Sequence, residues 1–369
     1  RLYVKEAGST DLVAGTEILA IDGVPAGEII EKIFALFPVD GDTDFIKGES
    51  VVGPDEFMGP AFDHFYPFLY ETRPEVKLTL AGGSAGARDE SVTRLTYKQY
   101  VEETGNVRYS NNFDDAVTFK LLSDTAAYLS VDTFVNYRRP VDPDTIYGPV
   151  FAQLAASGRD TLVLDLRRNG GGSDDAQSGL VQWLMPAAYR QADAVVVKSD
   201  RLDPGLKPYL GTWQQAALNP DPAWFKQRAD GMFEIVNPAV GKPASSIPAK
   251  EGAFTGKLIV LTSGDNASGV THLLSVFKTQ RPDTVFIGER TGGAATGATA
   301  GILLYLTLPH SGVKVRVPLQ RQEITNSDQL DPRLGITPDI LAPDTLTSTL
   351  AGTDPAMEAA LAYIAKSQS

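Results

Sequence analysis

Short apolar runs and one helical repeat alternate between residues 256 and 295. The run at 258–261 is typical of a buried strand, and a second run follows at 284–287. Between them lies a turn-rich segment at 262–266, after which apolar residues recur at positions 267, 270, 273, 274 and 277. That spacing predicts a helix that packs back on the sheet. Ser268 therefore lies where the turn after a strand enters a helix.

Similar patterns predict the other elements. Strand patterns occur at residues 76–80, 95–101, 116–122, 128–131 and 161–166, and residues 302–308 and 313–319 predict a hairpin around 309–312. Helical patterns occur at 146–156 and 174–185, and an amphipathic helix is predicted at 354–365. The Gly-rich segment 81–88 is predicted to be a flexible turn or linker.

Residues 1–80 predict a small β module. Residues 18–21 lead into Asp22-Gly23, a dipeptide typical of hairpin turns, and residues 29–37 have a helical pattern. The segment G-T-E-I-L-A-I-D-G-V-P at 15–25 resembles the core of PDZ domains, which bind extended peptides by adding a strand. A generic hairpin is the alternative. A long insertion at 38–67 makes peptide capture by this module doubtful.

Residues 198–250 carry many prolines and aromatic residues and lack simple alternation. One interpretation is a lid or a substrate-binding insertion. The other is a helical excursion with a small core of its own. We expect four regions: the module at 1–80, a linker and β subdomain at 81–125, a core at 126–353 with this insertion, and a terminal helix at 354–369.

Composition narrows the classes of function. Hydrophobic residues make up 43% of the 369 positions, which suffices for a sizeable core, and the net charge of −13 argues against binding nucleic acid or anionic membranes. The absence of cysteine excludes disulfides, thiol catalysis and Cys-ligated metal. Three scattered histidines are too few for a metal site. No run has the length of a transmembrane helix, and a chain that starts with Arg1 is expected to be a mature form or a fragment.

The position of Ser268 suits a nucleophile. Free backbone N–H groups and the positive end of the helix dipole stabilise an oxyanion at such a place. The ordinary alternative is that Ser268 caps the helix, as most serines at helix starts do. Asn266, Ala267 and Ser268 also form a triplet of the N-glycosylation type.

A glycine-rich loop follows the strand at 161–166. It contains Gly170, Gly171 and Gly172, and such a run lets backbone N–H groups approach a ligand closely. A flexible turn is the alternative. Asp165 and Arg167, at the end of the strand, are expected to hold this loop in place.

The order of these motifs resembles the C-terminal-processing (tail-specific) serine peptidases, including their tricorn-core and retinol-binding-protein-like branches. The resemblance is carried by D-L-R-R-N-G-G-G at 165–172, A-S-G at 267–269, I-G-E-R-T-G-G at 287–293 and G-I-T-P-D at 335–339. It implies an α/β fold with a crotonase-like, superhelical βαβ core and a PDZ-like module. It also implies that Ser268 is the nucleophile, with oxyanion N–H groups from Gly269 and from Gly170 or Gly171.

The resemblance offers two kinds of catalytic base. One branch uses a Lys in a loop that matches residues 291–295, where this chain has Ala294. The other uses a His upstream of the PDZ-like module, which we expect to lie before Arg1. Of the histidines present, His272 follows Ser268 by four residues on the same helix face, and His64 reaches the site only if the module docks there. His310 lies in the predicted hairpin turn and is expected to be solvated.

An acid that orients the base is implied just before G-I-T-P-D. The matching position is Pro332, so a shift of one residue would make Asp331 this acid. An ordinary aspartate in an Asp-Pro turn is the alternative.

The resemblance thus implies a secreted or periplasmic serine peptidase that hydrolyses unfolded polypeptides or peptides through an acyl-enzyme on Ser268, without metal or cofactor. A catalytically inactive peptide- or ligand-binding protein on the same scaffold is the alternative. The absent Lys and His favour it, as does Thr271, where the family often has Glu. A small-ester hydrolase is a third possibility. Oligomeric state and cleavage preference are left open by the sequence.

Overall fold

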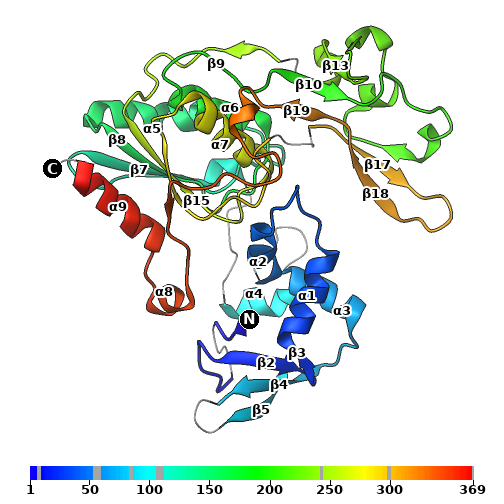
Figure 1. Cartoon of the computed structure of the whole chain (residues 1–369), viewed down its shortest axis with the longest axis vertical. Coiled ribbons are helices and arrows are strands. Elements are labelled where there is room, and N and C mark those ends of the chain that lie inside the picture. Colours follow the sequence, from blue (N-terminus) through cyan, green and yellow to red (C-terminus); the bar gives the residue numbers. More distant parts are fainter. Residues whose placement is uncertain are drawn as a thin grey trace.

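The computed structural model describes residues 1–5, 10–52, 60–82, 86–104, 112–241, 244–296 and 301–367. Three parts are visible in Figure 1: a central sheet between helices, an N-terminal module beneath it, and a β extension that projects to one side. We use "N-terminal module" for the described residues up to Thr93, and "β extension" for strands β10–β13 and β17–β19.

The central sheet has the strand order β20-β16-β15-β8-β7-β6, and all neighbours are parallel except β6 and β7. Its strands are β6 (Val117–Leu121), β7 (Ala126–Val131), β8 (Thr161–Asp165), β15 (Lys257–Thr262), β16 (Val285–Gly288) and β20 (Ile340–Leu341). The strands predicted at 116–122, 128–131, 161–166, 258–261 and 284–287 are confirmed.

Helices cover both faces of this sheet, so the fold is mixed α/β. On one face lie α5 (Pro143–Ser157), α6 (Asp174–Leu184) and α7 (Ser268–Gln280), and on the other lies α9 (Pro355–Ser367), as Figure 1 shows. Alternate residues of β8 explain this: Leu162 and Leu164 are buried with α5, α6 and α7, whereas Val163 is buried with α9. The three helices predicted from apolar spacing outside 256–295 are confirmed, as is α7.

The N-terminal module is a five-stranded antiparallel sheet covered by helices. Its strands are β1 (Leu2–Tyr3), β2 (Glu17–Ile21), β3 (Val24–Pro25), β4 (Glu75–Ala81) and β5 (Ala87–Thr93), and its helices are α1 (Ala26–Leu36), α2 (Phe45–Val52) and α3 (Ala61–Leu69). The predicted turn at Asp22-Gly23 and the helix at 29–37 are confirmed. The segment 81–88 is a hairpin rather than a linker, because β4 reaches Ala81 and β5 starts at Ala87; its tip, 83–85, lies outside the described residues.

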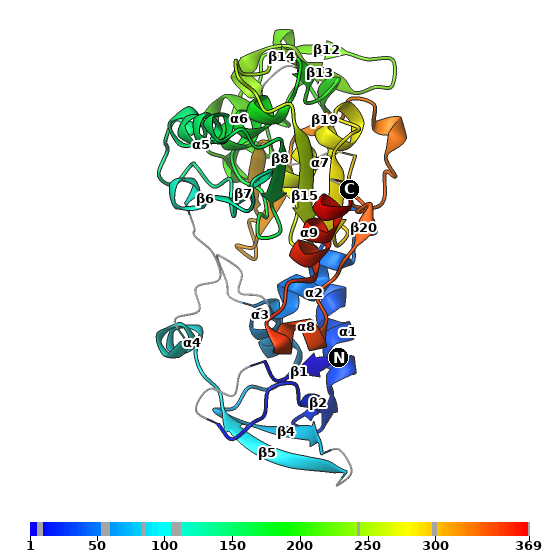
Figure 2. The same ribbon diagram turned by 90° about the vertical axis from the view of Figure 1, so that its left-hand side faces the viewer.

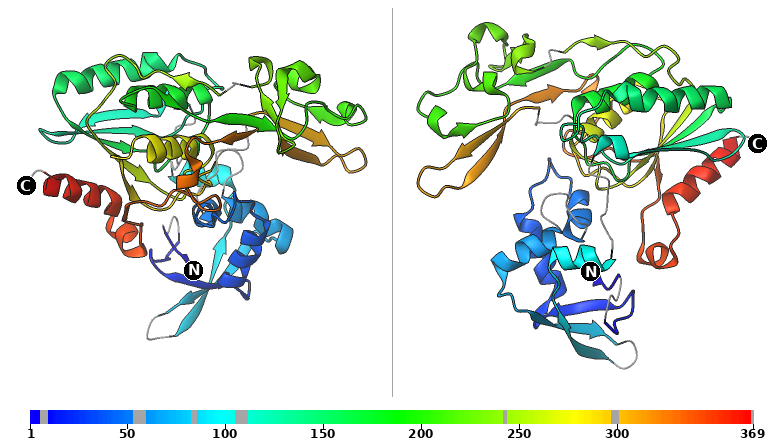
Figure 3. Two further views of the ribbon diagram at one scale, coloured as in Figure 1. Left: turned by 45° about the horizontal axis from the view of Figure 1, so that its top comes forward. Right: turned by 180° about the vertical axis from the view of Figure 1, so that it is seen from behind.

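Several segments of the rest of the chain contact this module. The Phe45 ring of α2 lies 5.4 Å from the Arg290 guanidinium, and Figure 3 shows the N-terminal module, in blue, below the core and the β extension. Helix α8 (Leu346–Ala351) lies beside the module in Figure 2, and a Cβ atom built on Gly15 would be 2.7 Å from Leu350 Cδ1.

The strand predicted at 95–101 is wrong, because this segment contains α4 (Tyr97–Thr104). A capping box starts the helix: the Thr96 N–H donates to Gln99 Oε1 over 2.9 Å, and the Gln99 N–H donates to Thr96 Oγ1 over 3.2 Å. This local capping outweighs the strand propensity of the apolar and aromatic residues around it.

The β extension contains two small sheets. One has the order β12-β13-β10-β19, from Phe225–Gln227, Phe233–Ile235, Ala194–Val197 and Arg321–Glu323, and the other has the order β11-β17-β18, from Leu210–Gly211, Leu303–Thr307 and Lys314–Pro318. β9 (Tyr189–Arg190) pairs with β14 (Ser246–Ile247) nearby. The hairpin predicted at 302–319 is confirmed.

The segment 198–250 shares two small buried clusters with neighbouring strands rather than having a core of its own. Val195, Val197 and Ile235 form one buried cluster, and Ala217, Ile302 and Leu304 form another. A helical excursion is also wrong, because the described residues of this segment form short strands and single 3₁₀ turns. Its prolines remove N–H groups that a long helix would need.

Candidate active site

The glycine loop and the Ser268 turn leave the central sheet side by side. The first follows β8 and the second follows β15, and these strands are parallel neighbours, with Asp165 opposite Leu261. The carboxyl ends of parallel strands meet at one edge, which is where open α/β sheets bind ligands. The sheet thus brings together residues that lie about a hundred positions apart in the sequence.

Ser268 is the first residue of α7, and its neighbour Ala267 occupies the N-cap position without a side-chain cap. The interpretation of Ser268 as an ordinary helix cap is therefore wrong. Its φ angle of +53° lies in the left-handed region, which residues other than glycine adopt at a cost of about 1 kcal/mol or more. The side chain is exposed, and no described residue forms a hydrogen bond with its Oγ.

Gly171 packs directly against this turn. A Cβ atom built on Gly171 would lie 2.9 Å from Ser268 Cβ and 3.0 Å from the Ala267 carbonyl oxygen, and its φ is +111°. A side chain at this position would push the two loops apart. Glycine at 171 is therefore required for their contact.

The backbone N–H groups of the loop differ in their partners. The Gly171 N–H donates to Asn169 Oδ1 over 2.8 Å, so it is bound within the loop rather than free for an oxyanion. Gly170 and Gly172 are exposed, and no described group accepts from their N–H groups. A Cβ atom on Gly269 would lie 3.8 Å from the Gly172 nitrogen, and a Cβ atom on Gly171 would lie 3.1 Å from the Gly269 nitrogen, so Gly171 and Gly172 both lie beside Gly269.

The hydrogen bonds around Gly172 show in which direction its N–H group points. Phe134 bonds to both sides of it: the Phe134 N–H donates to the Gly171 oxygen over 3.0 Å, and the Ser173 N–H donates to the Phe134 oxygen over 2.8 Å. In a parallel bridge of this kind, the N–H of the central residue points to the opposite side. The Gly172 N–H therefore faces away from Phe134.

Two fully buried asparagines join the loops. Asn266 Nδ2 donates to the carbonyl oxygens of Leu166 (2.6 Å) and Asn169 (3.1 Å), and its Oδ1 accepts the Ser263 N–H over 2.9 Å. Asn169 Nδ2 donates to the Val131 oxygen over 3.0 Å. Because the Asn266 amide is buried and bonded, it does not act as a glycosylation acceptor in the folded protein. The sequence analysis did not predict that Asn169 and Asn266 hold the loops together. The feature that could have indicated it is an asparagine in each of the two turns that follow a buried strand.

The loop 291–295 also lies against the Ser268 turn. The Gly293 N–H donates to the Asn266 oxygen over 2.8 Å, and Thr271 Oγ1 donates to the same oxygen over 3.1 Å. Ala294, half-buried, therefore occupies a loop in contact with the turn, and it supplies no amine there. Thr271 is buried and contributes to the structure of the turn.

None of the three histidines forms a hydrogen bond with Ser268 Oγ in the described part of the chain. His272 is buried, and burial lowers its pKa, so its ring is neutral at pH 7. Its Nε2 lies 2.7 Å from the Gln191 carbonyl oxygen, which can only accept, so Nε2 carries the hydrogen and Nδ1 keeps the lone pair. His64 belongs to α3 and contacts the Phe65 and Phe68 rings at 4.9 and 5.8 Å. His310 is exposed.

Asp165 and Arg167 hold the start of the glycine loop, as predicted. Arg167 Nη2 lies 2.7 Å from Asp165 Oδ2, and its Nη1 lies 2.7 Å from Asp354 Oδ1, just before α9. Tyr128 Oη also donates to Asp165 Oδ2 over 2.9 Å. The Asp165 carboxylate is thus fully used in structural contacts.

Asp331 is exposed, and its Oδ1 accepts the Arg333 N–H over 2.9 Å, which is the contact of an ordinary Asp turn. The neighbouring Arg333 forms an ion pair with Asp42 of the N-terminal module, and its carbonyl oxygen accepts the Asp42 N–H over 2.8 Å. Among the described residues, no contact joins Asp331 to Ser268 or to a histidine.

A hollow of about 200 Å³ lies between the start of α6 and the β extension. Asp174, two residues after Gly172, lines it together with Trp213, Gln214 and Gln320. Within the described ranges there is no cluster of His, Asp and Glu that fits a metal ion. None of the helices in those ranges is both apolar enough and long enough to cross a membrane.

Comparisons with known proteins identify the family of this chain and structures with a similar fold. The family model Peptidase family S41 matches residues 125–342. The structure of mature CPAF complexed with lactacystin is similar at 13% identity and a TM-score of 0.55, covering 92% of this chain and 75% of that one. The photosystem II D1 C-terminal processing protease is 17% identical, with a TM-score of 0.41 over 90% of this chain. This chain spans 64% of that protease.

A putative peptidase from Parabacteroides merdae ATCC 43184 is 16% identical, with a TM-score of 0.45, over 93% of this chain and 89% of that one. No curated protein sequence matches this chain.

Proposed function

Because the chain belongs to peptidase family S41, we propose that it is a serine peptidase that hydrolyses unfolded polypeptides or peptides through an acyl-enzyme on Ser268. The observation that carries this proposal is the position of Ser268. Its side chain is exposed at the start of α7, with left-handed backbone, in contact with a glycine loop in which the Gly170 and Gly172 N–H groups have no acceptor among the described residues. Strained residues of this kind cluster at active sites.

The first step would be attack of Ser268 Oγ on a peptide carbonyl carbon, which forms the ester bond as the C–N bond breaks. The Gly269 N–H lies in the first turn of α7, where it has no partner within the helix. Together with the Gly172 N–H it would hold the oxyanion, and Gly170 is the other exposed donor of the loop. One such donor contributes about 10²–10³-fold to the rate. Water then releases the acyl group.

The base that accepts the Ser268 proton is the open part of this proposal. One branch of the family has its lysine base at the position of Ala294, so the loop at 291–295 does not supply a lysine here. His272 is neutral and has a basic Nδ1, but its described hydrogen bond goes to Gln191 rather than to Ser268. We propose a histidine outside the printed sequence as the base, oriented by an acid such as Asp331, and His272 as the candidate within it.

An inactive binding protein on the same scaffold is the second candidate. It is favoured by one observation: no described side chain that can act as a base is bonded to Ser268 Oγ. In that case the hollow beside Asp174 would hold a peptide without cleaving it.

We also propose the type of core, the type of N-terminal module and the location of the protein. The βαβ units around β7, β8, β15 and β16 support a crotonase-like core, and the order β1-β2-β4-β5 with α1 supports a PDZ-like module. The family resemblance supports a secreted or periplasmic location.

The test is intact-mass labelling with a fluorophosphonate, which reacts with activated serines. We expect one adduct on the chain and none on Ser268→Ala. An adduct that persists in Ser268→Ala would contradict the assignment of the nucleophile. Labelling of His272→Gln, whose amide replaces the donor to Gln191, shows whether His272 is the base. Hydrolysis of a fluorescein-labelled denatured polypeptide, compared with a small ester, then separates peptidase from esterase.

If the chain is not labelled, the same measurement on a longer form that includes the residues before Arg1 decides between the two candidates. Labelling of the longer form supports a peptidase whose base lies upstream. Absence of labelling in both forms supports the binding protein.

A further inference from the structure

The β extension ends in an exposed edge strand. β18 (Lys314–Pro318) pairs with β17 on one side, and in the described part of the chain it has no strand on the other. All of its residues are exposed, including Val315 and Val317 at 39% and 38%. Such an edge is a template for another strand, and the charges of Lys314 and Arg316 and the ring of Pro318 restrict which strands can pair with it.

The register shows which groups of β18 are free. The Leu308 N–H donates to the Val313 oxygen over 2.8 Å and the Leu319 N–H donates to the Ile302 oxygen over 2.9 Å, so every second residue of the strand bonds to β17. Lys314 and Arg316 are the residues between these bonded positions, so their backbone N–H and C=O groups point away from β17. Pro318 is the next residue of this outward-pointing set, but it has no N–H group, so the row of free donors along β18 stops before it.

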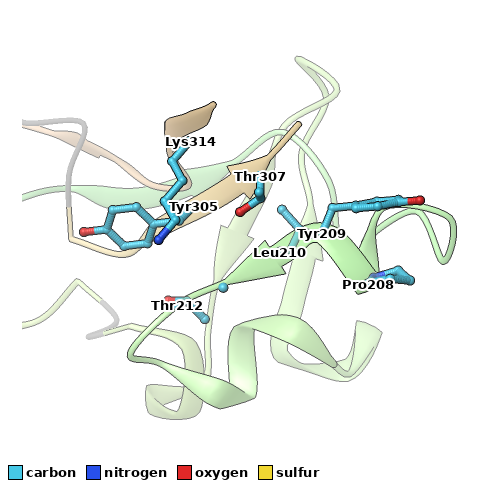
Figure 4. Close-up of a pocket in the computed structure, with 8 residues that line it drawn as sticks. Pro208, Tyr209, Leu210, Thr212, Tyr305, Thr307 and Lys314 are labelled. Atoms are coloured by element: carbon cyan, nitrogen blue, oxygen red, sulfur yellow. The ribbon is translucent and has the colours of Figure 1, made fainter. Parts of the chain in front are cut away.

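The side chains of Lys314 and Arg316 lie on one face, opposite Thr307 and Tyr305 of β17. Neither cation has a carboxylate partner among the described residues, although the chain as a whole carries a net charge of −13. Lys314, Tyr305 and Tyr209 line one hollow, and Figure 4 shows the end of the Lys314 side chain beside the Tyr305 ring, with Tyr209 on the other side. This hollow measures about 690 Å³, and no acidic side chain lines it.

Trp213 lies between this face and a second hollow. It lines the hollow that Asp174 also lines, and its ring lies 6.2 Å from the Tyr305 ring in an edge-to-face contact. It is 59% exposed. Side chains that a bound chain can contact therefore extend from Asp174, at the start of α6, over Trp213 and Tyr305 toward β18.

We propose that β18 is a docking strand for an extended, acidic segment of the polypeptide substrate, and this rests on the proposed peptidase function. The segment adds a strand to the edge through the backbone groups of Lys314 and Arg316. Its acidic side chains, at every second position, lie beside these two cations, and its neighbouring part covers Tyr305. A second copy of β18 is disfavoured as the occupant, because pairing two such edges would bring like charges together.

The test measures binding without cleavage. Fluorescence anisotropy follows a short fluorescein-labelled peptide with Glu at every second position, bound to the full chain carrying Ser268→Ala. A peptide with Gln in place of Glu is the control. We expect saturable binding of the Glu peptide that weakens with added salt, and about tenfold weaker binding by Lys314→Glu/Arg316→Glu, which corresponds to about 1.4 kcal/mol.

Arg316→Pro tests the strand addition itself. It removes an outward N–H while the bonds to β17 remain, and Pro318 already belongs to the same outward-pointing set, so the hairpin should fold. Lys226→Glu, on edge strand β12 of the other small sheet, is the matched charge control and should bind as Ser268→Ala does. Circular dichroism verifies that each variant is folded.

Equal binding of the Glu and Gln peptides, unchanged binding by the double variant, or equal weakening by Lys226→Glu would overturn the proposal. A dimer that is detected by sedimentation of the unmodified chain and is absent from Arg316→Pro would also overturn it, because a second copy of the chain would then occupy the edge of β18. Fluorophosphonate labelling of the unmodified chain tests the peptidase function separately. Failure of labelling leaves the docking result standing, and failure of docking leaves the labelling result standing.

Discussion

The asparagine that joins the two active-site loops permits the sharpest prediction. Asn266→Ala removes two donated hydrogen bonds and one accepted bond from a side chain that is 0% exposed. The Leu166 oxygen keeps a partner, because it also accepts the Asn169 N–H over 2.8 Å. The Ser263 N–H and the Asn169 oxygen lose the side-chain partner. Each group left unsatisfied in the interior costs about 1–3 kcal/mol, so we expect a loss of about 3 kcal/mol in the free energy of unfolding.

Asn266→Asp distinguishes the effect of the size of this side chain on stability from the effect of its hydrogen bonds. It preserves the size of the side chain and the acceptor for Ser263, but it places a carboxylate oxygen against two carbonyl oxygens. We expect it to be at least as destabilising as Asn266→Ala at pH 7. Asn219→Ala, at an exposed position, should change stability by less than about 0.5 kcal/mol.

Urea unfolding followed by tryptophan fluorescence measures these free energies, and fluorophosphonate labelling without urea measures the effect on Ser268. We expect labelling of Asn266→Ala to slow while the protein is still folded, because the glycine loop is released from the Ser268 turn. Stability within 0.5 kcal/mol of the unmodified chain would refute the reasoning that this side chain holds the loops together.

Three further predictions follow from contacts elsewhere. Gly171→Ala should slow fluorophosphonate labelling strongly, because its Cβ would lie 2.9 Å from Ser268 Cβ, whereas Gly170→Ala, whose nearest neighbour would be at 3.8 Å, should be tolerated; equal effects would contradict the packing. Burial opposes the ionised form of Asp354, but hydrogen bonds from Arg167 and the Met357 N–H outweigh it and lower its pKa. A folded-state pKa below the unfolded value of about 3.9 stabilises the protein above that pH, and this contribution is lost as pH falls through the folded pKa. The stability difference between the chain and Asp354→Asn, measured by urea unfolding, should thus shrink below about pH 4; a constant difference would argue against the ion pair. Arg281→Met should lower the unfolding free energy by about 3 kcal/mol, since the buried guanidinium donates to the carbonyl oxygens of Leu184, Phe254 and Gly256. Arg321→Met, at an exposed arginine, is the control, and equal values for the two would contradict this role.

The helix at 97–104 shows one limit of reading elements from apolar runs. Around residues 95–101 the apolar and aromatic residues favoured a strand, yet Thr96 and Gln99 form a capping box that starts a helix. The capping signal was present in the sequence as T-Y-K-Q, so a search for caps could have found it. The hairpin of β4 and β5 was missed for a different reason: β5 is mostly exposed and polar, so it has no apolar alternation.

The sequence by itself determined the central strands, the helices on them and the position of Ser268 at a strand-to-helix turn. These follow from local periodicity, because the residues that a strand or helix buries recur along the chain at fixed spacing. It also determined that Ala294 cannot act as the lysine base of related peptidases. Which glycine N–H groups are free could not be read from it, since all three glycines are alike in sequence. Only the fold shows that Asn169 takes the Gly171 N–H and that Gly172 faces Gly269. The bond between Asn169 and Gly171 lies within one loop, but the position of Gly172 beside Gly269 is set by contact between two loops about a hundred residues apart, and that contact exists only once β8 and β15 pair.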